Sequence, residues 1–180
     1  NVVVWSQANP QTKGLNVVAY DTQSGKTSYV DPSVHAQLHA RTDGRYVVWA
    51  DCRNDPKCNY GNWGNTDIYR HDLQTGKTEL VSDNPAQQIF PDVSGKWVTW
   101  QDSRNDPKSI TPHLDWARID AYVKNMDSGA EHYMTAWQIG QYAQHPKVDG
   151  GKLLYLTRDT KQNGALFLVD LEAYEKARKP

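Results

Sequence analysis

The side chains best suited to metal chemistry gather in one short stretch of the chain. Five of them offer oxygen atoms: Asp51, Asp55, Asn59, Asn62 and Asp67. Carboxylate and amide oxygens are the ligands that Ca²⁺ prefers, so the stretch predicts a calcium site. The spacing is not that of an EF-hand loop. The alternative is a set of ordinary turns, in which Asp pairs with Arg of a neighbouring repeat. Both interpretations stay open, and no other cofactor is indicated.

Two cysteines, Cys52 and Cys58, lie in the same stretch. A similar run occurs later in the chain, where the corresponding positions are both serine, Ser103 and Ser109. Because the two positions change together, we predict that Cys52 and Cys58 form a disulfide. Disulfides persist in oxidising compartments, which indicates a periplasmic, secreted or cell-surface location. Two free thiols are the alternative, whereas a zinc site would need further ligands at suitable spacing.

Three tryptophans, Trp63, Trp116 and Trp137, fall in or near the long segments between apolar runs. Trp side chains on loops contribute strongly to binding, so these residues are candidates for a rim that binds a protein or glycan partner. The alternative is that they fold the long segments back against the sheets. The sequence contains no G-x-S-x-G, no H-E-x-x-H and no glycine-rich phosphate loop. We therefore name no catalytic residue.

The elements that must position these residues follow from a repeat. Residues 47–56 return as residues 98–107, and the Trp within each run has a counterpart at Trp5. Each copy contains a turn, an apolar run with a large aromatic residue, and a strand–turn–strand pair such as residues 67–82. The runs are rich in Val, Ile, Tyr, Trp and Thr and are bounded by Gly, Asp, Asn or Ser, as β-strands are.

A four-stranded antiparallel unit that repeats at about 40–50 residues is typical of a β-propeller blade. We therefore predict an all-β chain of about three and a half blades, with units at 1–32, 33–86, 87–141 and 142–170. The first unit lacks its first strand and the last lacks its fourth. Because a closed ring has about 4 to 8 blades, we expect further blades or a second chain to complete this partial propeller. The tail, residues 171–180, is rich in helix formers and is expected to cap the last blade.

His39, Phe90 and His145 occupy the same place in three copies, five residues before a turn glycine. This place lies on the first strand of each unit, and first strands line the central channel of a propeller. His39 and His145 are therefore candidates for contacting a ligand or a metal in the channel. Phe90 shows that the position also accepts a plain packing residue, which favours a structural role.

The composition excludes two classes of function. The chain has 180 residues, with 20 basic and 21 acidic side chains and a formal net charge of −1. Without a basic cluster there is no electrostatic footprint for nucleic acid or for an anionic membrane surface. No stretch approaches the roughly 20 apolar residues of a membrane span.

Residues 91–105, taken together with residues 67–77, resemble the TolB-like β-propeller repeats. These repeats occur in bacterial periplasmic proteins and in bacterial and archaeal cell-surface proteins, so the resemblance also implies an extracytoplasmic location. It covers nearly all the chain in three to four copies. The first copy departs from the pattern at residues 6–9, and the fourth matches it loosely at residues 157–159.

The resemblance implies a fold and leaves the activity open, because the family includes a periplasmic Tol component, adhesion-type surface proteins, lyases and peptidase-associated domains. We expect a non-enzymatic scaffold that binds a protein or glycan partner through its loop rim. One alternative is part of a propeller lyase or hydrolase with a site in the channel. Another is a structural subunit of a surface assembly.

Overall fold

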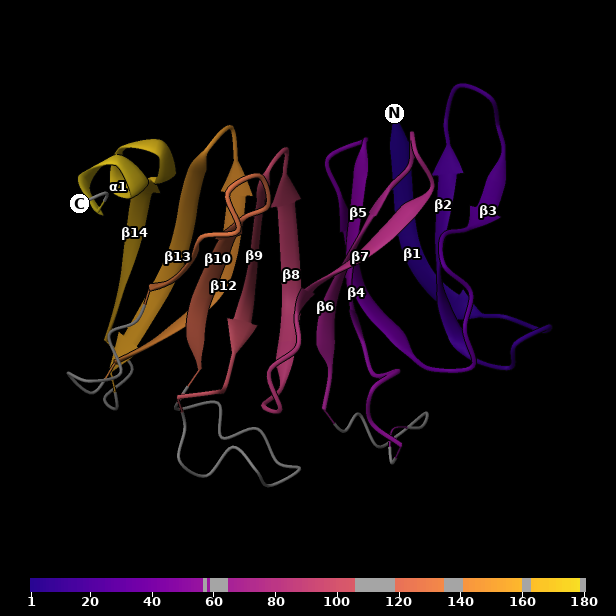
Figure 1. Ribbon diagram of the computed structural model, residues 1–180, viewed down its shortest axis with the longest axis horizontal. Coiled ribbons are helices and arrows are strands. Elements are labelled where there is room, and N and C mark those ends of the chain that lie inside the picture. Colours follow the sequence, from indigo (N-terminus) through magenta and orange to yellow (C-terminus); the bar gives the residue numbers. More distant parts are fainter. Residues whose placement is uncertain (57, 59–64, 106–118, 135–140, 160–162, 179–180) are drawn as a thin grey trace.

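The computed structural model describes residues 1–56, 58, 65–105, 119–134, 141–159 and 163–178. Within these residues the strands form four antiparallel sheets that follow one another along the chain (Figure 1). The first sheet contains β1 (Val2–Ala8), β2 (Leu15–Asp21) and β3 (Thr27–Tyr29), and the second contains β4 (Gln37–Thr42), β5 (Tyr46–Asp51), β6 (Asp67–Asp72) and β7 (Lys77–Ser82). The third contains β8 (Gln88–Ser94), β9 (Trp97–Asp102), β10 (Asp120–Asn125) and β11 (Glu131–Met134), and the fourth contains β12 (Gln141–Asp149), β13 (Lys152–Asp159) and β14 (Gly164–Asp170). We call the sheets blades 1 to 4.

Large aromatic residues pair across the middle strands of the two complete blades. Trp49 on β5 lies opposite Tyr69 on β6, and their rings stack with centroids 6.2 Å apart. Trp100 on β9 lies opposite Tyr122 on β10 in the same way, with centroids 5.8 Å apart. Directly opposed aromatic pairs stabilise an antiparallel sheet and fix its register. The repeated Trp and Tyr positions of the sequence are therefore cross-strand partners.

The blades pack face to face, and each contact between neighbours has its own apolar core. The core between blades 1 and 2 contains Val17, Ala40, Val47, Trp49 and Tyr69. The core between blades 2 and 3 contains Val48, Ala50, Ile68, Val81, Val93, Val98, Trp100 and Tyr122. The core between blades 3 and 4 contains Trp97, Ala121, Val123, Met134, Ala143, Val148, Leu153 and Leu171. Each middle blade thus buries both of its faces.

The two end blades bury only one face. Trp5 on β1 has the same place as Trp49 and Trp100 in the repeat, yet it is 38% exposed whereas they are fully buried. At the other end Leu166 and Leu168 on β14 are each 69% exposed. The structure is therefore a partial propeller with an uncovered apolar face at each end, in blades of three, four, four and three strands.

The chain ends in helix α1 (Leu171–Arg178), which packs beside blades 3 and 4. The carboxylate of Asp170 accepts a hydrogen bond from the backbone N–H of Ala173 at 3.0 Å, which caps the start of the helix. Leu171 is fully buried, and Glu172 forms an ion pair with Lys96 at 2.7 Å. None of the helical residues in the described part of the chain belongs to a segment long and apolar enough to span a membrane.

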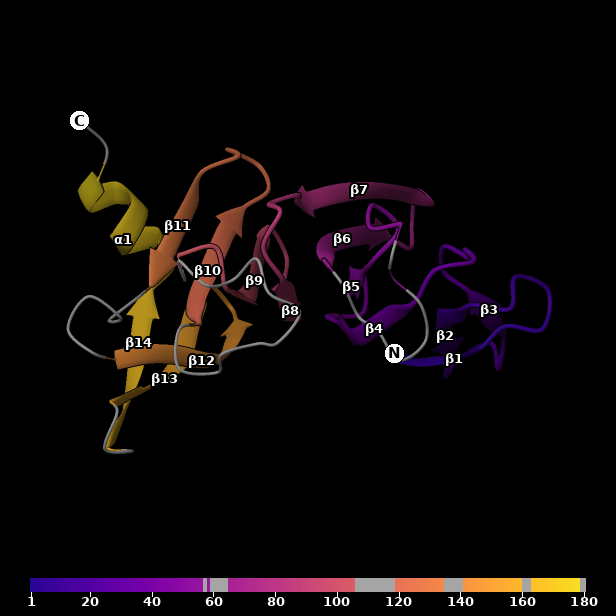
Figure 2. The same ribbon diagram turned by 90° about the horizontal axis from the view of Figure 1, so that it is seen from below.

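The two ends of the blades differ. The tight turns between β4 and β5, β8 and β9, and β12 and β13 lie at the upper end in Figure 1. Strands β5 and β9 end, and strands β6 and β10 begin, at the lower end. Seen from below, β4, β8 and β12 lie close together, and the sheets spread outward from them (Figure 2). These are the first strands of their blades, as the repeat predicts.

Candidate functional site

A buried carboxylate lies at the lower end of each complete blade, at the last residue of its second strand. Asp51, at the end of β5, accepts a hydrogen bond from Trp49 Nε1 at 2.8 Å and an ion-pair contact from Arg53 Nη2 at 2.5 Å. In blade 3, Asp102 accepts from Trp100 Nε1 at 2.8 Å and from Arg104 Nη2 at 2.6 Å. Both carboxylates are buried. Such charge-assisted hydrogen bonds fix the point at which each long loop begins.

The asparagine of the repeat ties that loop start to the next strand. Asn54 Nδ2 donates to Asp67 Oδ2 at 2.7 Å and to the Tyr69 hydroxyl at 3.1 Å. Blade 3 repeats the arrangement with Asn105, Asp120 and Tyr122, at 2.7 and 2.8 Å. Burial raises the pKa of both Asp67 and Asp120 to about 6, although the asparagine hydrogen bonds oppose the rise. The loop thus leaves and re-enters the sheet at fixed points.

The arginines of the two networks also join neighbouring blades. Arg53 Nη2 lies 2.7 Å from Asp31 on the connection from blade 1, and its guanidinium covers the Tyr69 ring at 4.2 Å. Arg104 Nη2 donates to Ser82 Oγ of blade 2 at 2.8 Å. One of the two alternatives from the sequence is that Asp and Arg pair across blades. The Arg53–Asp31 pair fits that alternative, and each arginine also pairs with the aspartate two residues before it in the same blade.

The described residues allow a partial view of the proposed calcium ligands. Asp51 is occupied by Trp49 and Arg53, and Asp55 accepts the backbone N–H of Asn65 at 2.7 Å. Asn59 and Asn62 lie outside the described residues. Within the described part, no three His, Cys, Asp or Glu side chains are placed to hold a metal ion. The calcium site stays a prediction.

Cys52 and Cys58 form a disulfide, as the sequence predicts, with their Cα atoms 5.9 Å apart. The bridge lies directly after β5, beside the buried Asp51 network. In blade 3, the hydroxyl of Ser103 instead accepts the backbone N–H of Gln87 at 3.2 Å. The rim candidates Trp63, Trp116 and Trp137 belong to segments outside the described residues.

The channel candidates meet in one row. His39 on β4, Phe90 on β8 and His145 on β12 lie side by side, with ring centroids 4.1 Å apart for the first pair and 6.1 Å for the second. Each lies in a β-bulge, where the register of its strand shifts. Each also has a left-handed backbone, with φ values of 57°, 52° and 49°. That conformation costs a residue other than glycine about 1–2 kcal/mol.

The row lines a pocket of about 180 Å³ that also includes Arg41, Pro91, Pro146 and Lys147. Sequence reasoning found the three aromatic residues and missed the two cations. The signal was present: Arg41, Asp92 and Lys147 each lie two residues after a member of the row. The bulge is what the sequence pattern could not show, because no glycine marks it.

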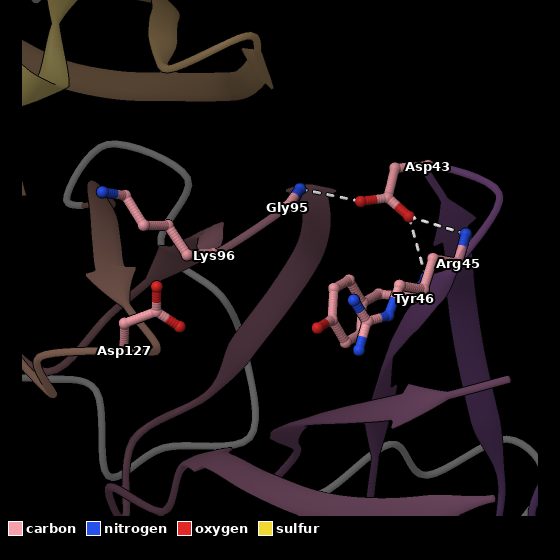
Figure 3. Close-up of a pocket in the computed structure, with 6 residues that line it drawn as sticks. All are labelled: Asp43, Arg45, Tyr46, Gly95, Lys96 and Asp127. Atoms are coloured by element: carbon pink, nitrogen blue, oxygen red, sulfur yellow. Dashed lines mark hydrogen bonds between the residues drawn. The ribbon is translucent and has the colours of Figure 1, made fainter. Parts of the chain in front are cut away.

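A second hollow, of about 460 Å³, lies beside the turns from β4 to β5 and from β8 to β9 (Figure 3). Asp43 there accepts backbone N–H groups from Arg45 and Tyr46 in its own turn, and from Gly95 in the next turn at 2.7 Å. The hydrogen bond from Arg45 lowers the pKa of Asp72 to about 2. Asp43 joins the turns of the two blades, and the Arg45–Asp72 pair fixes the blade 2 side, so we interpret this hollow as a structural joint.

Comparisons with known proteins identify the fold. No family model and no curated protein matches the chain. Among solved structures, a putative TolB from Agrobacterium tumefaciens matches with a TM-score of 0.63 at 14% identity, over 95% of this chain and 58% of that one. The β-propeller domain of the trilobed protease from Pyrococcus furiosus matches with a TM-score of 0.60 at 12% identity, over 93% and 45%. An oligogalacturonate lyase in complex with manganese matches with a TM-score of 0.57 at 17% identity, over 88% and 46%.

These likenesses show a β-propeller fold shared with TolB and with propeller proteases and lyases. At such identities they show the fold alone. The chain spans between about two fifths and three fifths of the length of these three structures. The resemblance read from the sequence is thus supported at the level of the propeller, and no family is assigned.

Proposed function

We propose that this chain is a non-enzymatic, TolB-like propeller scaffold that binds a protein or glycan partner through the loops at the lower end of blades 2 and 3. The observation that carries the proposal is the duplicated buried network at the base of those loops. A binding loop loses less conformational entropy on association when its two ends are already fixed. Asp51 with Asn54, and Asp102 with Asn105, fix one end of each loop to a rigid sheet.

The proposal also places the protein in an oxidising compartment, in the periplasm, at the cell surface or outside the cell. Its support is the Cys52–Cys58 disulfide, because such bridges are rare where glutathione and thioredoxin keep thiols reduced. The bridge joins Cys52 to Cys58 directly after β5, which complements the anchoring role of Asp51.

A binding screen tests the rim. Trp63→Ala and Trp116→Ala are expected to reduce binding to a glycan or protein ligand found on arrays by at least about tenfold, with an unchanged thermal midpoint. Trp5→Ala, on the uncovered face of blade 1, is the matched control and should leave binding intact. An equal loss of binding in all three variants, or no loss in any of them, would refute binding through the loop rim.

The row of His39, Phe90 and His145 favours a second candidate, an enzymatic role as part of a propeller lyase or hydrolase. The specific observation is three strained aromatic residues in one pocket, because strained backbone clusters at functional sites. Turnover of anionic polysaccharides or peptides that is lost in His39→Ala and His145→Ala would establish it. Binding without turnover would favour the non-enzymatic scaffold.

The uncovered faces of blades 1 and 4 support a further part of the proposal, that the working propeller contains additional blades from the same gene or from a partner chain. The residues equivalent to Trp5 in the inner blades, Trp49 and Trp100, are fully buried. A structural subunit of a surface assembly would bury them in the same way, and ordered assembly in solution would distinguish it.

A further inference from the structure

We infer that the pocket formed by His39, Phe90 and His145 binds a small anionic group, a carboxylate or a phosphate, held by Arg41 and Lys147. The inference does not depend on the loop-rim binding proposed above, because it concerns the first strands and not the loops. Three independent features of the pocket lead to it: the residues chosen at the bulges, the arrangement of the rings, and the balance of charge beside them.

The first feature is the choice of residue at the bulges. The left-handed backbone at positions 39, 90 and 145 would suit glycine, which adopts it without a steric penalty. The tight turns that the structure describes in these blades do use glycine at positive φ, at Gly44, Gly76, Gly95, Gly129 and Gly150. At the bulges the chain instead has an aromatic ring in all three blades. The backbone conformation alone therefore does not explain why these positions carry aromatic rings, and we infer a role for the side chains.

The second feature is the arrangement of the rings. Phe90 lies between the two imidazoles and is tilted by 49° to His39 and by 53° to His145. Pro91 and Pro146 add apolar surface to the same pocket. The result is a small apolar wall that carries an imidazole at each end. Such a surface suits the carbon part of a small organic anion.

The third feature is the charge beside the rings. Two residues after each ring, the strands carry Arg41, Asp92 and Lys147, which gives two cations to one carboxylate. Asp92 Oδ2 is 3.8 Å from Lys147 Nζ and also accepts the backbone N–H of Val148 at 3.1 Å. Arg41 Nη1 donates to the carbonyl of Ala40 at 3.0 Å, and the residue is exposed. The pocket therefore keeps an excess of positive charge.

The pKa shifts of His39 and Lys147 are consistent with an excess of positive charge in the pocket. Burial lowers the pKa of His39 and of Lys147, and the charge of Arg41 lowers both further, while Asp92 opposes the change at Lys147. Neighbouring positive charges repel one another, and a bound anion would reduce that repulsion. It would supply the negative charge that Asp92 alone does not provide. Asp92 thus acts as an internal competitor for the ligand.

The test uses the whole chain and two probes, inorganic phosphate and glutarate, followed by NMR titration of the ring resonances of His39, Phe90 and His145. We expect saturable shifts with at least one probe. Arg41→Gln and Lys147→Gln should each weaken binding by at least about tenfold, whereas Asp92→Asn should strengthen it by about threefold. Lys77→Gln, an exposed lysine on β7, is the matched control and should bind as the unaltered chain does.

The two probes also separate the two chemistries. Phosphate binding with no response to glutarate assigns the pocket to phosphate groups, and the reverse assigns it to carboxylates. The inference is overturned if neither probe shifts the three rings, or if Lys147→Gln and Lys77→Gln bind alike. It is also overturned if Asp92→Asn, shown to be folded by its circular dichroism spectrum, binds more weakly than the unaltered chain. Both cations are on the surface, so their replacement is not expected to unfold the protein.

Discussion

Blades 2 and 3 and blades 1 and 4 are built from the same repeat, but their equivalent residues lie in opposite environments. Trp49 and Trp100 are fully buried between blades, whereas Trp5 is 38% exposed. The difference does not come from the strands themselves, because β1 pairs with β2 as regularly as β5 pairs with β6. A blade therefore forms the hydrogen bonds between its own strands without help, but most of its apolar burial comes from its neighbours.

The largest expected effect is a difference between two identical substitutions. Trp100→Ala should lower the free energy of unfolding by about 3–5 kcal/mol, because it leaves a cavity in the core between blades 2 and 3 and removes the donor to Asp102. Trp5→Ala should lower it by less than about 1 kcal/mol. Urea unfolding followed by circular dichroism measures both. Equal losses would mean that the face of blade 1 is covered in solution.

The second effect is on the pH dependence of stability. The pKa of Asp120 is about 6 in the folded chain against an ordinary value of 3.8, so between about pH 4 and 6 the unfolded chain ionises first and the folded chain loses stability as pH rises. Over this range Asp120→Asn should gain up to about 3 kcal/mol relative to the unaltered chain.

Asp170 in blade 4 provides the opposite case. Its pKa is lowered by the backbone N–H of Ala173 and by Lys152, so Asp170→Asn should lose stability relative to the unaltered chain as pH rises through the acid range. Urea unfolding curves at pH 3.5, 5 and 7 show whether each variant gains or loses stability relative to the unaltered chain as pH rises. The same sign in both variants would contradict the assignment of burial as the cause at Asp120.

The third effect distinguishes the two complete blades. Replacing both Cys52 and Cys58 by Ser should cost about 2 kcal/mol, because the bridge closes a short loop and limits the unfolded chain. The double variant then resembles blade 3, which has Ser103 at the first of these positions. Urea unfolding under oxidising and reducing conditions measures the cost. Reductant should destabilise the unaltered chain and leave the double variant unchanged, and a response of the double variant would disprove the bridge as the cause.

The smallest effect lies on the uncovered face of blade 4. Leu166→Lys and Leu168→Lys should change the free energy of unfolding by less than about 0.5 kcal/mol, since both side chains are 69% exposed. They should also reduce the fluorescence of a dye that binds apolar surfaces. Ile68→Lys, in the core between blades 2 and 3, is the contrasting variant and should prevent folding. A large loss in Leu168→Lys would show that this face is occupied.

The blade architecture could be predicted from the sequence because its signals are local and repeated. The runs of β-branched and aromatic residues in 46–51 and 97–102 predict strands, and the returning Asp and Asn mark where they end. The disulfide was also predictable, since Cys52 and Cys58 change together to serine in the next copy. Neither prediction required knowledge of how the blades pack.

The candidate sites were less predictable, because they depend on contacts between blades. Nothing in the residues around His39 announces a bulge, and the nearness of Arg41 to Lys147 follows only from the packing of β4, β8 and β12. The pairing of Arg53 with Asp51 was likewise hidden. A sequence pattern names the Asp and the Arg, but the distance of 2.5 Å to Asp51 depends on the fold of the loop start.

The turns at the upper end of the blades offer a way to observe this packing over time. The amide of Gly95 donates to Asp43 of the preceding blade, and the amide of Gly150 donates to Ser94 at 3.1 Å. Amides at the tips of exposed turns usually exchange with solvent within seconds. Here each one is bound by a side chain of the preceding blade, and separation of the two blades breaks that hydrogen bond. Deuterium uptake at these two glycines therefore responds to the opening of each pair of blades, one pair at a time.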